Sequence, residues 1–265
     1  MKTRAFAGGA GLAILGLMTV SPLIHAEAPD WEHVVAAYVV GASLDGSAGV
    51  ADVTADIDVS FSDILDNLDA GFMFAYRGER GPWSIGLDFS FMGLESKASG
   101  TGPGGGTSAK IESDQYIVQL DVGHVLTERL GIYAGVRYTE LDVSIAVAGG
   151  GPLGETLGRS GSESWADPVI GLRYAAPLGN RWALMAKGDI GGFGVASDST
   201  WQAMAFAAYS FNEHARLLLG YRHIDVDYED GEGANRFSWD VATSGPTVAF
   251  AWQFSSCPGV ERPAM

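Results

Sequence analysis

Cysteine and positive charge are both scarce in this sequence. It has one cysteine, Cys257, so an internal disulfide bond cannot form. Its 16 Lys and Arg residues stand against 32 Asp and Glu residues, which gives a formal net charge of −16. Nucleic-acid binding needs a basic face, so the composition argues against DNA or RNA as a partner.

Long apolar runs are also missing, except at the N-terminus. There, Lys2 and Arg4 precede an apolar run rich in Gly and Ala, residues 5–20. A basic start, a short apolar core and a small residue before the cut, here Ala26, are the parts of a secretory signal peptide. We therefore predict that residues 1–26 are removed on export, which leaves 14 basic and 32 acidic residues.

Two alternatives remain at the N-terminus. Cleavage after Ala28 fits Ala-x-Ala spacing better, although it places Pro29 beside the cut. A retained helical anchor is disfavoured, because the apolar run of roughly 16 residues is shorter than the ~20 that a spanning helix needs.

In place of long apolar runs, apolar residues alternate along the chain with small or polar ones. In residues 83–91 the odd positions are all large and apolar, and the even positions are Ser, Gly, Asp and Ser. A strand places the two sets on opposite faces, which a helix cannot do. The pattern recurs in ten segments that we predict to be strands: 32–44, 67–79, 83–96, 109–126, 130–147, 162–177, 181–195, 199–212, 215–229 and 236–254.

The residues opposite the large apolar side chains indicate what each face meets. They are mostly Gly, Ala, Ser, Thr and Gln with isolated charges. A soluble barrel, the alternative fold, would be more richly charged on its water-facing side. Small polar residues suit the crowded interior of a narrow membrane barrel, and in lipid only helices and closed barrels pair every backbone group. We predict an all-β protein: a transmembrane, antiparallel up-and-down β-barrel of about ten strands, with eight possible, over residues 27–254.

The connections between the predicted strands alternate in length. The short turns are 79–82, 127–129, 178–180 and 212–214, and the longer connections are 45–66, 97–108, 148–161 and 230–235, with 196–198 as a short exception. Outer-membrane barrels have short turns on the periplasmic side, and an even strand number places both termini there. Residues 255–265 are therefore a predicted periplasmic tail. An aromatic girdle is expected near the short turns, from Tyr76, Trp83, Tyr133, Tyr174, Trp182, Tyr209 and Phe211.

Two stretches resemble a known group of proteins. They are 188–194, GDIGGFG, and 220–228, GYRHIDVDY, followed by a strand that ends at Phe254. They are similar to small proteobacterial outer-membrane β-barrel proteins of the porin-like and OmpW-like group, whose functions are largely unassigned. The resemblance implies the outer membrane of a Gram-negative bacterium, with lipid and lipopolysaccharide as surroundings. A last strand ending in Phe resembles the signal read by the barrel-insertion machinery, although here residues 255–265 follow it.

Nine charged residues fall on the predicted inward face of the strands. They are Arg77, Asp88, Asp121, Arg137, Asp167, Arg173, Lys187, Asp189 and Arg222. Paired with one another, they would plug a narrow barrel, because buried charges are tolerated only in pairs. Left partly open, they would line a polar path for small solutes. Sequence spacing does not decide between these two interpretations.

Segment 215–229 does not keep one parity. Leu219 and Tyr221 share a face, whereas Ile224 and Val226 fall on the other register. A β-bulge near 222–223 would reconcile the two halves. It would also turn the acidic residues that follow toward the barrel interior.

Three other motifs give weaker indications of a binding site or of local structure. Residues 225–236 resemble a calcium loop, but the glycine is one place late and Arg236 replaces the final Glu. Loop 45–66 contains six Asp and no Lys or Arg; it either gathers divalent cations shared with lipid headgroups or is simply solvated. Ser60 and Asp63 resemble a capping box and predict a short helix over 60–65.

No nucleotide or metal site is expected. The Gly-rich runs 100–106 and 149–151 lack a following Lys-Ser or Lys-Thr, and the histidines lack metal spacing. A rim enzyme would need His223 with Asp225 or Asp227, and no family motif supports it, so we expect no enzyme and no cofactor. The sequence predicts a narrow porin-like channel for small solutes or a structural envelope protein. The alternative is a surface-binding barrel whose long loops contact lipopolysaccharide or an external partner; a rim lipid-modifying enzyme is less favoured.

Overall fold

The computed structural model describes residues 30–50, 53–63, 68–102, 105–148 and 157–256. The predicted signal peptide and Cys257 lie outside these ranges. None of the helical segments within them is long and apolar enough to cross a membrane.

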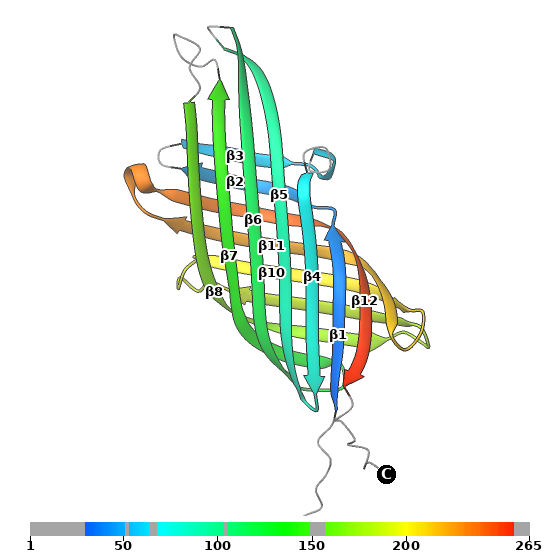
Figure 1. Ribbon diagram of the computed structural model, residues 1–265. Helices are drawn as coiled ribbons and strands as arrows, with labels where there is room; N and C mark the ends of the chain where they lie inside the picture. Colours follow the sequence, from blue (N-terminus) through cyan, green and yellow to red (C-terminus); the bar gives the residue numbers. More distant parts are fainter. Residues whose placement is uncertain (1–29, 51–52, 64–67, 103–104, 149–156, 257–265) are drawn as a thin grey trace, which may run out of the picture.

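The chain folds into a closed antiparallel barrel of ten strands, as predicted (Figure 1). Strands β4 to β12 follow one another in sequence order, and β1 closes the ring by pairing with β4 on one side and β12 on the other. The strands are β1 (Trp31–Val40), β2 (Ser43–Val50), β3 (Val53–Val59), β4 (Leu68–Arg80), β5 (Trp83–Gly102), β6 (Gly105–Val125), β7 (Leu130–Ala148), β8 (Leu157–Pro177), β9 (Trp182–Gly191), β10 (Ser199–Ser210), β11 (Ala215–Asp230) and β12 (Phe237–Ser256).

The β2–β3 hairpin is an addition that the sequence did not predict, because all but its first two residues lie in the acidic stretch 45–66 that we expected to be a loop. β12 is 20 residues long and pairs with β1 only over Thr247–Ser256. β2 continues from β1 and pairs with the remaining part of β12, Phe237–Ser244. The hairpin therefore covers a strand edge that would otherwise be left unpaired.

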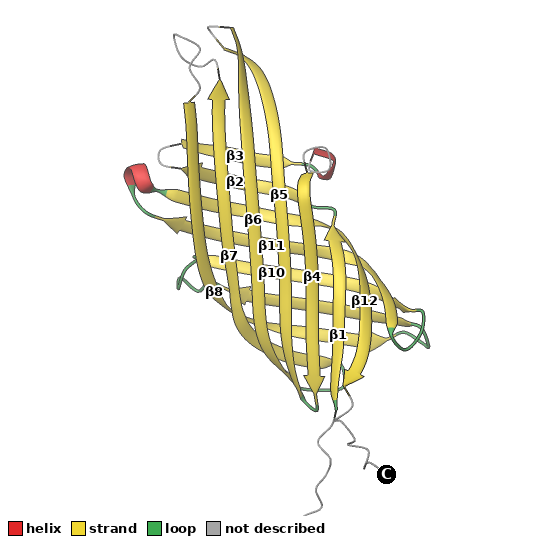
Figure 2. Cartoon of the chain, in the orientation of Figure 1, coloured by secondary structure: helices red, strands yellow, loops and turns green. Residues whose placement is uncertain are grey.

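A helical turn follows the hairpin at residues 61–63 (Figure 2). The Ser60 hydroxyl donates to the Asp63 carboxylate at 2.5 Å, and the Asp63 N–H donates back to the hydroxyl at 3.3 Å. The predicted capping interaction thus forms, and the rest of the predicted helix lies outside the described residues.

The two ends of the barrel differ in length. One end of the barrel holds the first residue of β1 and the last residue of β12. There the strands are joined by short turns, and we call this the turn end. At the opposite end, the loop end, β5 to β8 project well beyond the other strands (Figure 1). These strands have 19 to 21 residues, whereas a bilayer crossing needs about 9–11. A large part of each strand therefore lies outside the hydrocarbon layer.

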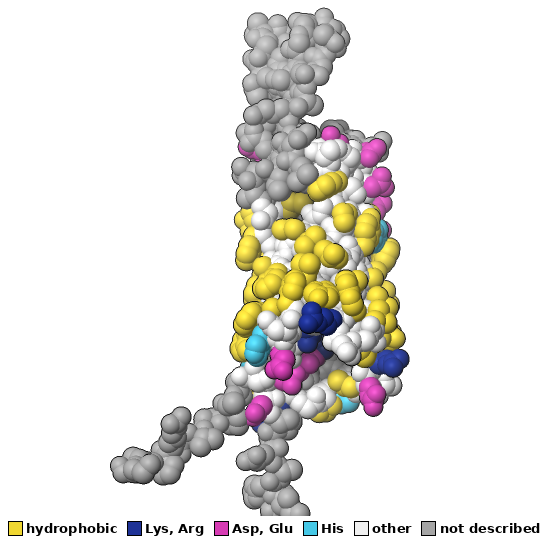
Figure 3. Space-filling view, turned by 90° about the vertical axis from the view of Figure 1, so that its right-hand side faces the viewer, with side chains coloured by type: hydrophobic (Ala, Val, Ile, Leu, Met, Phe, Trp, Pro, Cys, Tyr) yellow, Lys and Arg dark blue, Asp and Glu magenta, His cyan; other side chains and the backbone are white. Residues whose placement is uncertain are grey.

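Apolar side chains form a band nearer the turn end on the face that Figure 3 shows, and exposed apolar residues occur on strands all around the barrel. Leu120, Val136, Ile170, Leu219 and Phe250 point outward and are 45–58% exposed. A continuous exposed apolar belt is not a feature of soluble proteins and identifies the surface that faces lipid.

Most of the predicted aromatic girdle belongs to this outward surface. Trp83 and Trp182 are 56% and 47% exposed close to the turns. The placement of Tyr133 in the girdle was wrong. It is 1% exposed inside the barrel, because its neighbours Ile132 and Ala134 occupy the outward parity of β7.

The predicted bulge in β11 was also wrong. β11 pairs with β12 without interruption from Ala215 opposite Trp252 to Asp230 opposite Phe237. The parity of the strand is constant, and its surroundings change instead. Before Arg222 the outward residues are apolar and meet lipid; beyond it the outward residues are polar, and the inward residues are apolar.

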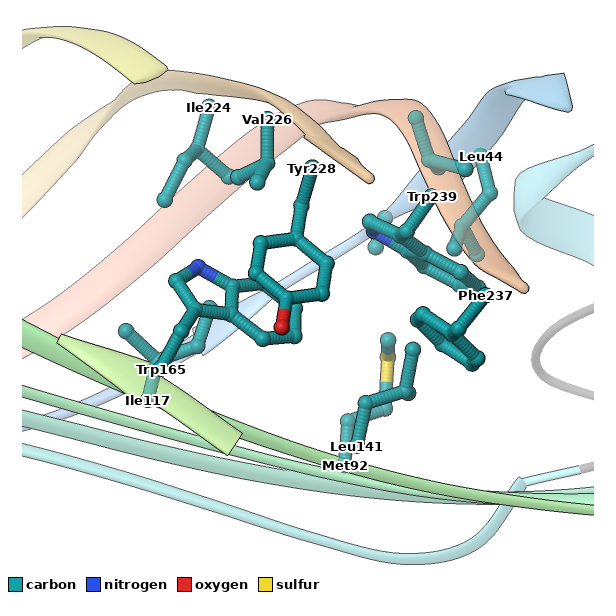
Figure 4. Close-up of a cluster of buried hydrophobic side chains, with 12 residues drawn as sticks. Leu44, Met92, Ile117, Leu141, Trp165, Ile224, Val226, Tyr228, Phe237 and Trp239 are labelled. Carbon is teal, nitrogen blue, oxygen red and sulfur yellow. The ribbon is translucent and has the colours of Figure 1, made fainter. Parts of the chain in front are cut away.

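The interior beyond the bilayer is consequently filled by an apolar cluster, which we call the apolar plug (Figure 4). Its centre is the stacked pair Trp165 and Tyr228, whose ring centroids lie 4.1 Å apart at an interplanar angle of 10°. The buried residues of the plug are Ala42, Leu44, Met92, Ile117, Leu141, Trp165, Ile224, Val226, Tyr228, Phe237, Trp239 and Val241. They come from opposite walls of the barrel and meet across its lumen.

Candidate functional site

The nine charged residues assigned to the inward face lie in the barrel interior, in two sets. Arg137, Asp167 and Asp189 are fully enclosed. The other six line a cavity near the turn end: Arg77, Asp88, Asp121, Arg173, Lys187 and Arg222.

Arg137 is the centre of the enclosed set. Its guanidinium lies 2.5 Å from the Asp189 carboxylate, and it donates to Gln119 Oε1 at 2.8 Å and to Thr200 Oγ1 at 2.9 Å. The side chains of Arg137 and Asp189 are 1% and 0% exposed. Each charge is therefore desolvated, and each is paired, which is the condition under which buried charges are tolerated.

Asp189 receives further hydrogen bonds on its second oxygen. The Tyr133 hydroxyl and the Gln202 side-chain amide each donate to it at 2.6 Å. Side chains from β6, β7, β9 and β10 thus join across the lumen. We call this set the ionic layer: Gln119, Tyr133, Arg137, Asp189, Thr200 and Gln202.

Asp167 sits at the boundary between the ionic layer and the apolar plug. It accepts the backbone N–H of Ser197 at 2.8 Å, so the loop between β9 and β10 is held against the barrel interior. Its other oxygen, the Ser197 hydroxyl, the Thr139 hydroxyl and the Trp165 indole N–H are buried with no hydrogen-bond partner among the described residues. Such a group of polar atoms is where ordered water is expected.

Below the ionic layer lies a cavity of about 380 Å³, which we call the turn-end pocket. Its mouth is formed by Glu79 and the turn residues Glu128 and Arg129. Its walls are largely apolar, with Val34, Ala36, Met185, Met204, Phe206, Leu218 and Ala249 contributing.

Ion pairs surround the inner part of this pocket. Arg173 lies 2.5 Å from Asp121, and Lys187 lies 3.7 Å from the other oxygen of the same carboxylate. Arg222 lies 3.5 Å from Asp88 and donates to the Tyr38 hydroxyl at 2.8 Å. Arg77 pairs with Glu79 near the mouth.

The structure places the rim residues His223, Asp225 and Asp227 on the outward face of β11. His223 faces outward with its ring 4.4 Å from that of Trp201, and its Nε2 has no hydrogen-bond partner in the described part of the chain. Asp225 and Asp227 also lie on the outward parity of β11, not toward the interior as the bulge would have required. Among the described residues, no three His, Cys, Asp or Glu side chains are grouped to hold a metal ion.

Acidic side chains gather on the outward surface beyond the bilayer. Asp227 is directly opposite Asp240, and Asp114 is directly opposite Asp142. The pKa of Asp227 is raised above its ordinary value, first by burial and then by the negative charges of Asp240, Asp198 and others nearby. Like charges directly opposite across two strands are destabilising.

Comparison with known proteins identifies the fold. No family model and no curated protein matches the chain. Among solved structures, the outer membrane protease OmpT from Escherichia coli aligns with 85% of this chain and 97% of its own, at 10% identity and a TM-score of 0.52. The translocator domain of the autotransporter NalP from Neisseria meningitidis aligns with 87% of this chain and 90% of its own, at 13% identity and a TM-score of 0.42. Ail from Yersinia pestis aligns with 85% of this chain and 99% of its own, at 10% identity and a TM-score of 0.40.

The similarity to OmpT establishes a shared barrel fold and nothing about activity. Together with the apolar band, it makes the chain a β-barrel of the outer-membrane type, as the sequence resemblance implied. A more specific family is not assigned. The sequence did not predict Gln119, Gln202, Thr200 and Tyr133 as polar partners of these charges, although all four occupy inward positions of their strands.

Replacing Arg137 by Met removes one partner of the buried pair and leaves Asp189 charged and desolvated. We expect a loss of about 3–5 kcal/mol in the free energy of unfolding, measured with urea in lipid vesicles. Arg181→Met, at an exposed turn, serves as the control and should change it by less than about 0.5 kcal/mol. An equally small effect of Arg137→Met would contradict the assignment of the pair as buried.

Asp227→Asn should raise the melting temperature at neutral pH. Because the folded-state pKa is raised, this carboxyl favours the folded state when protonated, and that contribution is lost as the pH rises through the raised pKa. The benefit of Asn should therefore vanish below the ordinary Asp range, near pH 3.9. Glu213→Gln, at an exposed turn, is the control. A stabilisation by Asp227→Asn that does not depend on pH would count against the electrostatic cause.

Proposed function

We propose that this protein is an outer-membrane barrel that is closed at rest, an envelope component and not a permanently open porin. The single observation behind the proposal is the stacking of two filled layers along the lumen. The ionic layer, which Arg222 connects through Gln202 to Tyr38 and Asp88 on the facing strands, crosses the barrel at one level, and the apolar plug fills it at the next. A porin needs a water-filled polar interior along its whole length.

The chemistry of the two layers makes each a barrier to ions. An ion entering the plug would exchange water for Trp, Tyr and aliphatic side chains, at a large desolvation cost. An ion crossing the ionic layer would have to displace Arg137 from Asp189 at 2.5 Å. The two barriers act in series, so the proposal does not rest on either one alone.

The other candidate functions have less support. A rim enzyme would need His223 to engage a nucleophile or a carboxylate, and its ring is packed against Trp201 instead. A surface-binding role would depend on 45–66, which contains the β2–β3 hairpin, and on 148–161, which lies largely outside the described residues. We keep the absence of enzymatic activity as part of the proposal.

The direct test is single-channel recording in planar bilayers. Protein shown independently to be inserted, by heat-modifiable migration and by protease resistance, should give no sustained conductance steps at low applied voltage. Stable ohmic steps from the same preparation would overturn the proposal and return the inward charges to the role of a pore lining.

A further inference from the structure

The turn-end pocket has a feature that a purely structural interior does not need. A cavity of about 30 Å³ lies among plug residues and Arg222, whereas about 380 Å³ remains open beneath the ionic layer. This volume lies within the range of small-molecule sites, about 300–1,000 Å³, which combine apolar walls with a few convergent polar groups. The pocket has both of these properties.

The charges around the pocket do not balance. Arg77, Arg173 and Arg222 each have a carboxylate partner, in Glu79, Asp121 and Asp88. Lys187 lies 3.7 Å from Asp121, but the same carboxylate is 2.5 Å from Arg173. Asp88 and Asp189 also attract the Lys187 charge, and each of them is paired with an arginine of its own. At the mouth, Glu128 and Arg129 cancel in formal charge. The pocket therefore carries one more cation than it has carboxylates.

The surplus positive charge lies where two cations are side by side, over the Tyr133 ring. Arg173 and Lys187 are directly opposite each other on β8 and β9. The Arg173 guanidinium lies 4.3 Å and the Lys187 ammonium 5.0 Å from the centre of the Tyr133 ring. The Asp121 carboxylate contacts both cations and balances one of the two positive charges, so the charge that is left over favours a second anion beside them. Both side chains keep some exposure, 15% and 17%, so a ligand in the pocket can reach them.

The remaining walls of the pocket are apolar and favour an anion that also has an apolar part. Met185, Met204, Phe206 and Leu218 present an apolar surface from β9, β10 and β11. A small hydrophilic anion would leave that surface wet, whereas an anion with an apolar ring or chain would cover it.

We propose that the turn-end pocket binds an organic carboxylate with an apolar body, which enters from the periplasmic side. The carboxylate meets Lys187 and Arg173, and the apolar body lies against Met204 and Phe206. This role is independent of the closed-lumen proposal, because the pocket is complete below the ionic layer.

The test is isothermal titration of the full barrel in an uncharged detergent, with empty micelles as the blank. The probe is 2-naphthoate; the neutral 2-naphthylmethanol and the anion acetate are its matched controls. We expect saturable binding of naphthoate and at least about tenfold weaker binding of either control, since a charge-assisted contact contributes about 1.5–3 kcal/mol. Binding of the alcohol equal to that of naphthoate, or partition no greater than into empty micelles, would overturn the proposal.

Two variants separate the charge from the volume. Lys187→Met removes the surplus cation at similar size and should weaken naphthoate binding by about tenfold or more. Met204→Trp fills the apolar part and should abolish binding with all charges in place. Arg181→Met, outside the pocket, should leave affinity unchanged. If Lys187→Met does not fold, unaltered binding in Met204→Trp alone would refute the assignment. Conductance recordings remain a separate readout, so failure here does not affect the closed-lumen proposal.

Discussion

The strict alternation of side chains along an unbroken strand is the constraint on which this structure depends. One face of each strand always points into the barrel, but its surroundings change along the barrel axis. Inside the bilayer, lipid requires an apolar exterior, which leaves the small and polar residues for the interior. Beyond the bilayer, water requires the reverse. β11 meets both requirements without changing register, with Leu219 outward in lipid and Val226 inward beyond it.

The two interiors that result are both filled with side chains, for different physical reasons. In the bilayer, the inward charges are desolvated and must be paired, so Arg137 and Asp189 draw Gln119, Gln202, Thr200 and Tyr133 around them. Beyond the bilayer, the inward side chains pack as they would in a soluble core, around Trp165 and Tyr228. The level nearest the turn end keeps an open space of about 380 Å³, and there the charges are left unbalanced.

Much of the fold could be predicted because side-chain alternation is a local property. It identified all ten barrel strands to within a few residues at most ends, and it assigned the nine inward charges to their faces. It could not say which charges meet, because Arg137 and Asp189 are 52 residues apart and their contact depends on strand stagger. The β2–β3 hairpin was missed because its acidic composition suggested a loop. The supposed bulge at Arg222 came from assuming one solvent along the whole strand.

Accessibility along β11 tests the central claim most directly. Single cysteines at 219, 221, 224, 225, 226, 227 and 228, in a Cys257→Ser background, would be treated with a membrane-impermeant maleimide in lipid vesicles. The account predicts labelling at 225 and 227 only, because 219 and 221 face lipid and 224, 226 and 228 face the apolar plug. Labelling at 226 and 228 with protection at 225 and 227 would contradict it, since the outer interior would then be an aqueous lumen.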